Sequence, residues 1–83
     1  MNLYSVNKNI KILNTIRNNK SMSKYEKSLI DDIICLLAIN REEDRRDILC
    51  KLNKIPVHNS YVNILNYVYL SLNSNWKIKY ISI

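Results

Sequence analysis

Short polar side chains follow the single proline of the chain, and their chemistry suits contact with the bases of a nucleic acid. Pro56 marks a turn, after which Asn59 or Ser60 can cap a new helix. The polar set consists of His58, Asn59, Ser60, Asn63 and Asn66. A carboxamide such as that of Asn63 can make two hydrogen bonds to one adenine, so a helix that starts here carries groups able to read base edges.

Two lysines lie on each side of this polar set. Lys51 and Lys54 precede the turn, and Lys77 and Lys79 alternate near the end of the sequence. Ammonium groups neutralise phosphates and hold a protein on a duplex without reading its sequence. The lysines and the polar set together predict a nucleic-acid-binding face, although each asparagine taken singly also fits a solvated helix face.

Thiol and imidazole groups are too few and too far apart for a metal site. Cys35, Cys50 and His58 are separated by 15 and 8 positions, a spacing that matches no zinc-binding pattern. Both cysteines lie in apolar helical patterns, so we expect buried, reduced thiols rather than nucleophiles. The chain has no glycine, which excludes the phosphate-binding loops of nucleotide-binding folds. We expect no enzyme activity, no metal ion and no cofactor.

Two amphipathic helices are predicted in the first half of the chain. The stripe of the first consists of Leu3, Val6, Ile10 and Leu13, widened by Ile12 and Ile16. Ser5 is its expected N-cap. Ser23 and Glu26 form the capping-box pattern ahead of a second helix, which we expect to run to about Ile39. The core stripe expected for the second helix is Ile30, Ile33, Ile34 and Leu37.

A third, charged helix is predicted before the proline. Asn40 and Glu43 repeat the capping-box spacing, and Asp47 and Lys51 form an i,i+4 pair of the favoured orientation. We expect Ile48, Leu49 and Leu52 to point inward.

The last segment fits two descriptions. Tyr61, Leu65, Val68 and Leu72 keep helical spacing, yet "WKIKYISI" alternates like a strand and "NSN" can form a turn. The helix therefore either ends near Tyr67 and a β-hairpin follows, or it runs to Leu72 and leaves a single terminal strand without a partner.

Net charge is unevenly distributed along the 83 residues, which make one domain. The total is +6, of which residues 1–30 carry +5, residues 31–47 carry −3 and residues 48–83 carry +4. Two basic ends around an acidic middle are typical of a protein with a charged binding face. An AT-rich genome, which enriches lysine and asparagine codons, explains the same composition.

The order of elements resembles a winged helix-turn-helix. The resemblance covers residues 23–83 and is carried by "IICLLAIN", "DILCKLN", "HNSYVNILNYV" as the recognition helix and "YLSLNSNWKIKY" as the wing. It implies a mainly α fold with a small C-terminal β-hairpin and an extra N-terminal helix. It also implies a regulator of a virus, phage or mobile element that binds double-stranded DNA. The extra helix, residues 3–16, would then be a homodimer surface.

An all-α four-helix bundle is the alternative fold, and with it a different function. Such a bundle would suit a helical protein-interaction module, such as a small inhibitor or immunity-type protein. A hairpin over residues 67–83 favours DNA binding, and a continuous helix favours the bundle. In either case we expect an intracellular protein with no membrane segment and no small-molecule substrate.

Overall fold

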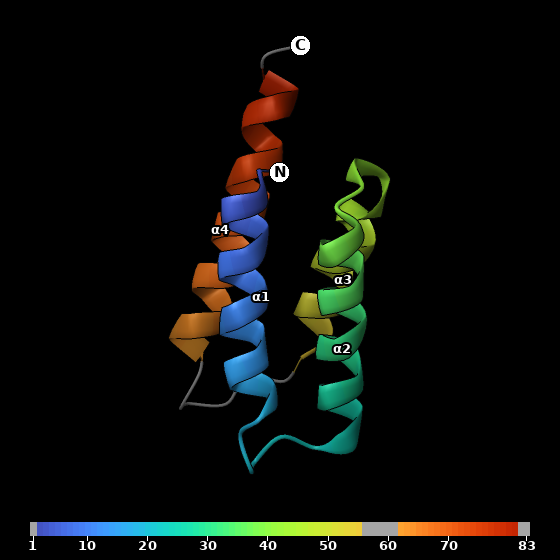
Figure 1. Ribbon diagram of the computed structural model, residues 1–83, viewed down its shortest axis with the longest axis vertical. Helices are drawn as coiled ribbons and strands as arrows, with labels where there is room; N and C mark the ends of the chain where they lie inside the picture. Colours follow the sequence, from blue (N-terminus) through green and yellow to red (C-terminus); the bar gives the residue numbers. More distant parts are fainter. Residues whose placement is uncertain (1, 56–61, 82–83) are drawn as a thin grey trace.

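The computed structural model describes residues 2–55 and 62–81, and within them the side chains of residues 2–55 and 63–73. The described part is mainly helical. Its elements are α1 (Leu3–Arg17), α2 (Lys24–Ile39), the 3₁₀ turn η1 (Glu42–Asp44), α3 (Arg45–Lys54) and α4 (Val62–Ile81). The four α-helices run alternately down and up in Figure 1, so each is antiparallel to its neighbour along the chain.

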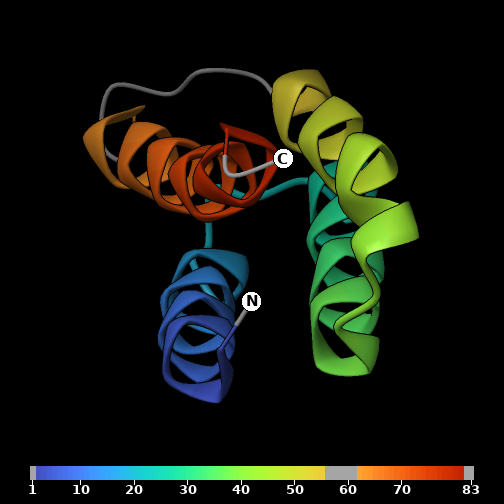
Figure 2. The same ribbon diagram turned by 90° about the horizontal axis from the view of Figure 1, so that it is seen from above.

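The helices form two layers of two. Figure 2, which looks along the bundle, places α1 beside α4 and α2 beside α3. Contacts run from α1 to α2, from α2 to α3, from α3 to α4 and back from α4 to α1. We call the first pair, with the connection 18–23, the α1–α4 layer, and the second pair, with η1, the α2–α3 layer. The expectation of a mainly α fold is confirmed.

Buried positions on the helices repeat at intervals of three and four residues. The buried side chains at this spacing on α1 are Val6, Asn9, Leu13 and Ile16, and those on α2 are Glu26, Ile30, Ile33 and Leu37. The same spacing of buried residues continues at Ile48 and Leu52 on α3, at Ile55 directly after it, and at Val68 and Leu72 on α4. Spacing of this kind brings one narrow stripe of each helix to the centre of a bundle. Each fully buried Leu or Ile side chain contributes about 1.5–3 kcal/mol through removal from water.

The predicted start of α2 is confirmed in atomic detail. The Ser23 hydroxyl accepts a hydrogen bond from the Glu26 backbone N–H at 3.1 Å, and the Glu26 carboxylate accepts one from the Ser23 N–H at 3.2 Å. These two bonds satisfy backbone donors that a helix start otherwise leaves unpaired.

Two other predicted caps are wrong. Helix α1 begins at Leu3, and its cap is Asn2, whose side chain accepts from the Ser5 N–H at 2.8 Å. Ser5 is therefore inside the helix. Asn40 ends α2 instead of beginning α3: its backbone is left-handed, with φ 57° and ψ 49°, and its N–H bonds Leu36 O at 3.1 Å. Asparagine tolerates this conformation better than other non-glycine residues, so it serves at both kinds of helix end.

The predicted β-hairpin is not confirmed. The described backbone of residues 62–81 is one helix, α4, and no strand occurs in the described residues. Leu65, Val68 and Leu72 point toward the bundle at helical spacing. The free energy gained by burying them outweighs the strand propensity of β-branched and aromatic residues, because that propensity is weak and depends on context.

Several predicted burials also differ. Leu3 is 71% exposed, and both Cys35 and Cys50 are exposed rather than buried. The polar Asn9 takes the core position that the apolar pattern had assigned to Ile10. Val6, Leu13 and Ile16, which belong to the same predicted stripe, are buried as expected. None of the described helices is both long enough and apolar enough to cross a lipid bilayer.

Candidate binding groove between α1 and α4

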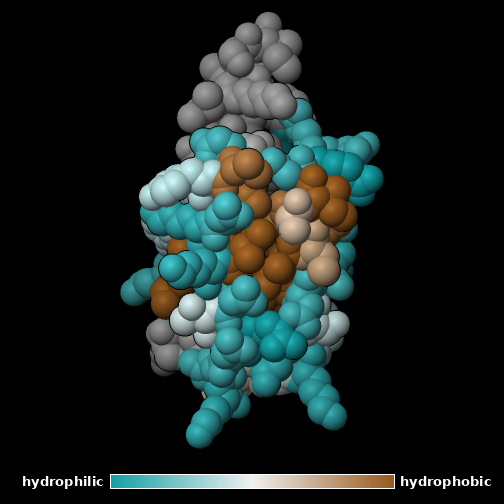
Figure 3. All heavy atoms as spheres, in the orientation of Figure 1, coloured by the Kyte–Doolittle hydropathy of each residue, from teal (hydrophilic) through white to brown (hydrophobic). Residues whose placement is uncertain are grey.

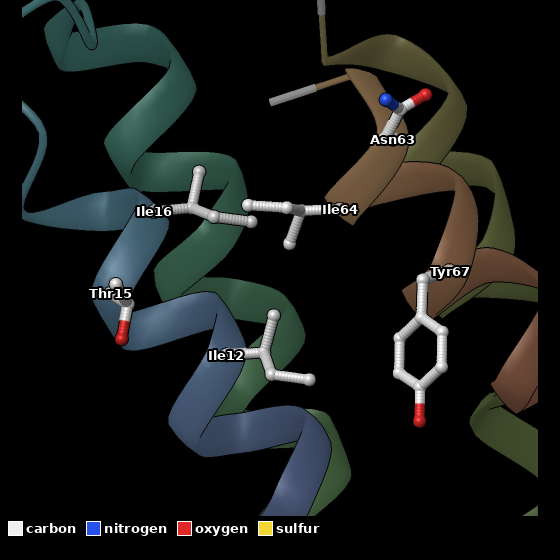
Figure 4. Close-up of a pocket in the computed structure, with 6 residues that line it drawn as sticks. All are labelled: Ile12, Thr15, Ile16, Asn63, Ile64 and Tyr67. Carbon is white, nitrogen blue, oxygen red and sulfur yellow. The ribbon is translucent and has the colours of Figure 1, made fainter. Parts of the chain in front are cut away.

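An apolar groove opens between α1 and the start of α4. It has a volume of about 430 Å³, and its lining residues are Ile12, Thr15, Ile16, Asn63, Ile64 and Tyr67. Figure 4 shows Ile16 and Ile64 pointing toward one another from the two helices, with Ile12 beside them on α1. Ile64 is 42% exposed and Tyr67 is 45% exposed, so the groove is open to solvent.

The sequence explains why Ile12, Ile64 and Tyr67 lie outside the core, whereas the fourth large lining residue, Ile16, is buried. On α4 the inward stripe is Leu65, Val68 and Leu72, and Ile64 and Tyr67 fall on the adjoining face. On α1, Ile12 lies one residue before the buried Leu13 and remains only partly covered. Large apolar groups left at the surface side by side are typical of a contact surface rather than of a solvated face.

Lys8 borders this groove. Its Nζ lies 5.3 Å from the centre of the Tyr67 ring, close enough for a cation–π contact between α1 and α4. Side-chain hydrogen bonding with Tyr67 raises the pKa of Lys8, and the charges of Tyr67 and Tyr4 raise it further. The ammonium therefore stays protonated at neutral pH. Lys11, three residues on, falls on the same side of α1 and is exposed.

All of the net charge belongs to the α1–α4 layer. The seven acids lie between Glu26 and Asp47, and the seven Lys and Arg residues from Lys24 to Lys54 balance them. The remaining six cations are Lys8, Lys11, Arg17, Lys20, Lys77 and Lys79, which lie on α1, the connection after it and α4. Neither α1 nor α4 contains a carboxylate side chain.

One of these cations already has a partner. Arg17 donates two hydrogen bonds to Asp31 on α2, the second from Nη2 to Oδ2 at 3.1 Å, and this side-chain hydrogen bonding raises the pKa of Arg17. The pair ties the two layers together at the end of α1. Lys8 and Lys11 make no ion pair with the carboxylates of the described residues.

The predicted nucleic-acid residues are not gathered on one described surface. Lys51 lies in the α2–α3 layer, where its Nζ is 2.9 Å from Asp47 Oδ1, and Lys54 is exposed at the end of α3. Asn63 lines the groove and Asn66 is exposed one turn later on α4. His58, Asn59 and Ser60 lie outside the described residues. Lys77 and Lys79 belong to α4, and the description there covers the backbone only.

Most of the groove residues were missed by reasoning from the sequence. Ile12 was assigned to the core stripe, and Ile64, Thr15 and Tyr67 were not singled out. The available signal was electrostatic: residues 1–25 and 48–83 contain no acid at all. Two acid-free segments that pair in space predict a surface for an acidic ligand.

A smaller depression, of about 210 Å³, lies elsewhere on the molecule. It is lined by Asp32, Cys35, Leu36, Asp47 and Lys51, between α2 and α3. No group of three or more possible metal ligands occurs among the described residues. Two of its charged lining residues, Lys51 and Asp47, are already paired with each other.

Apolar side chains also gather over α1 and α2 on the face drawn in Figure 3, with hydrophilic ones below them. The exposed Leu3 and Ile39 belong to these two helices.

Comparisons of the chain with protein-family models, with curated proteins and with solved structures give no match.

Proposed function

We propose that the chain is a small helical module that binds another protein through the α1–α4 groove. The observation that carries this proposal is the solvent-open apolar groove lined by Ile12, Ile16, Ile64 and Tyr67. Protein interfaces have a buried apolar centre rich in aromatic side chains, ringed by polar and basic groups. Tyr67 with its flanking Lys8 has the composition of such a centre and its rim.

The continuity of α4 supports the same proposal. A winged helix-turn-helix needs its last segment to fold into a hairpin that follows the DNA backbone, and residues 62–81 are described as one helix. An all-α bundle with an uncovered groove between two helices fits the interaction module expected as the alternative.

Site-specific cross-linking tests this function. A photoreactive amino acid in place of Tyr67 is expected to form an adduct of defined mass with one protein in the native cells. Its matched control is the same amino acid in place of Tyr25, which is exposed on α2. The cross-linked protein, once purified, should bind the parent chain, and Ile64→Asp should weaken that binding by about tenfold or more. Equal adducts from both positions, or none from Tyr67, would contradict the proposal.

DNA binding is a second candidate, favoured by the concentration of the whole net charge in one layer. Affinity for a duplex should then fall by roughly one log unit per tenfold rise in salt for each phosphate neutralised. Lys77→Glu with Lys79→Glu should weaken binding to all sequences, whereas Asn59→Ala with Asn63→Ala should relax sequence preference. A gel shift without binding at low salt eliminates this candidate.

A further inference from the structure

We infer that the occupant of the α1–α4 groove is an amphipathic helix with acidic flanks, supplied by another protein. This inference rests on the proposed function and specifies the chemistry of the partner.

The walls of the groove call for apolar side chains. Ile16 and Ile64 present methyl groups to one another across the gap, and Tyr67 adds an aromatic ring (Figure 4). Phosphates and base edges need hydrogen-bond donors, and of the lining residues only Thr15, Asn63 and the Tyr67 hydroxyl can provide them. The centre of this site therefore favours a protein over a nucleic acid.

The position of the groove favours a helix. It lies between two neighbouring helices and is bounded on α1 by Ile12 and Ile16, one helical turn apart. A third helix packs against such a pair with its side chains between theirs, as helices do in bundles. One or two large apolar residues of the partner would enter, and the rest of its stripe would cover the exposed parts of Ile64 and Tyr67.

The charges around the groove favour acidic flanks. Lys8 is at its edge against Tyr67, Lys11 is exposed on the same side of α1, and both bounding helices lack carboxylates. A partner with Asp or Glu beside its apolar stripe gains attraction from Lys8 and Lys11 along α1, and one with Lys or Arg there is repelled.

A second copy of the chain does not supply such a helix. Its acids are concentrated on η1, α3 and the middle of α2, but the apolar residues Ile48 and Leu52 of α3 are already buried. The large exposed apolar residues of α2 are Tyr25 and Ile39, which lie at its two ends and form no stripe. The acidic surface of the chain therefore has no free apolar face to offer.

Three synthetic peptides test the inference by fluorescence anisotropy with the full chain. The first is a helix with a leucine stripe and glutamates on its flanks, the second has lysine in place of every glutamate, and the third is acidic with the leucines scattered around the helix. The first peptide is expected to bind more tightly than the other two. High salt should weaken the binding of the first peptide without abolishing it, since salt does not screen the apolar contacts.

Paired variants locate the contact. Ile64→Asp should weaken binding of the first peptide by about tenfold or more, because Ile64 lines the groove. Ile39→Asp, at an isoleucine of α2 that is also exposed, should not weaken it. Lys8→Glu with Lys11→Glu should reverse the preference toward the lysine peptide. Lys24→Glu with Lys54→Glu, the same charge change at exposed positions of the α2–α3 layer, should leave it in place. Circular dichroism confirms that each variant is folded.

Each contrary result has a separate meaning. If the lysine peptide binds as tightly as the glutamate peptide, the inferred acidity is wrong, while an adduct from Tyr67 still upholds the proposed function. If the scattered peptide binds equally, the occupant is not an amphipathic helix. If duplex DNA displaces the first peptide and binds more tightly, the surface belongs to a nucleic acid and both proposals fall.

Discussion

The side-chain amide of Asn9 on α1 donates a hydrogen bond to Ser71 Oγ on α4, 3.4 Å away, across the interface of the two helices. The same amide nitrogen donates to Ser5 O at 2.8 Å, one turn earlier on α1. Asn9 is 1% exposed, and its Oδ1 has no partner among the described residues. A polar group at a repeating core position restricts how two helices can slide or rotate against each other, at a cost in stability.

Variants of Asn9 and Ser71 should separate the cost of losing one hydrogen-bond partner from the cost of burying both polar groups. Asn9→Ala is expected to destabilise the chain by about 1–3 kcal/mol, because it removes packing and leaves Ser71 without this bond. Asn9→Leu with Ser71→Ala, which removes both polar groups, should be as stable as the parent or more so. Urea unfolding measures the free energy of unfolding of the parent and of each variant. Equal destabilisation by the single and the double variant would contradict this account.

The left-handed conformation of Asn40 leads to a second prediction. Asn40→Ala should lower the free energy of unfolding by about 1 kcal/mol, since a β-carbon without a polar side chain is disfavoured at positive φ. Asn40→Gly has no such penalty and serves as the control, with stability close to that of the parent. Thermal unfolding followed by circular dichroism compares them, and an alanine variant as stable as the glycine variant would refute the role assigned to Asn40.

The ion pair of Lys51 and Asp47 leads to a prediction on pH. Hydrogen bonding to Asp47 raises the pKa of Lys51 above its ordinary value of 10.5. A group whose pKa is raised by folding stabilises the fold fully below its unfolded pKa and loses that effect as the pH rises through the folded pKa. The contribution should therefore be constant near neutrality and disappear above about pH 10.5.

Lys51→Met removes this contribution while keeping an unbranched side chain of similar length. The stability difference between parent and variant, measured by urea unfolding, should be constant from pH 7 to about pH 9 and shrink in stronger alkali. It should also be small and sensitive to salt, because Asp47 is exposed and Lys51 is only partly buried. A difference that grows with pH would show the assignment to be wrong.

Local sequence patterns predicted the individual helices of this fold better than they predicted which helices pack against each other. The Ser23 and Glu26 cap and the stripe of Ile30, Ile33 and Leu37 were read correctly, because both depend on residues within one helix. Asn40 was assigned to the wrong helix end, since an asparagine three residues before a glutamate fits a start and a stop alike.

The groove could not be predicted from such local patterns. Whether Ile12 is core or surface depends on how closely α4 approaches α1, which is a tertiary property. The same holds for Asn9: a polar side chain enters the core only because Ser5 O and Ser71 Oγ are in reach of its amide. Pattern reading assumes that buried positions are apolar, so it assigned the neighbouring isoleucine instead.

The unequal charge of the two layers also gives the molecule an electric dipole moment. Its positive end is the α1–α4 layer, and its other end is the charge-balanced α2–α3 layer. An approaching acidic protein exerts a torque that turns the groove toward it before contact, which raises the association rate constant. Dissociation, governed by isoleucine and tyrosine packing, would depend far less on ionic strength.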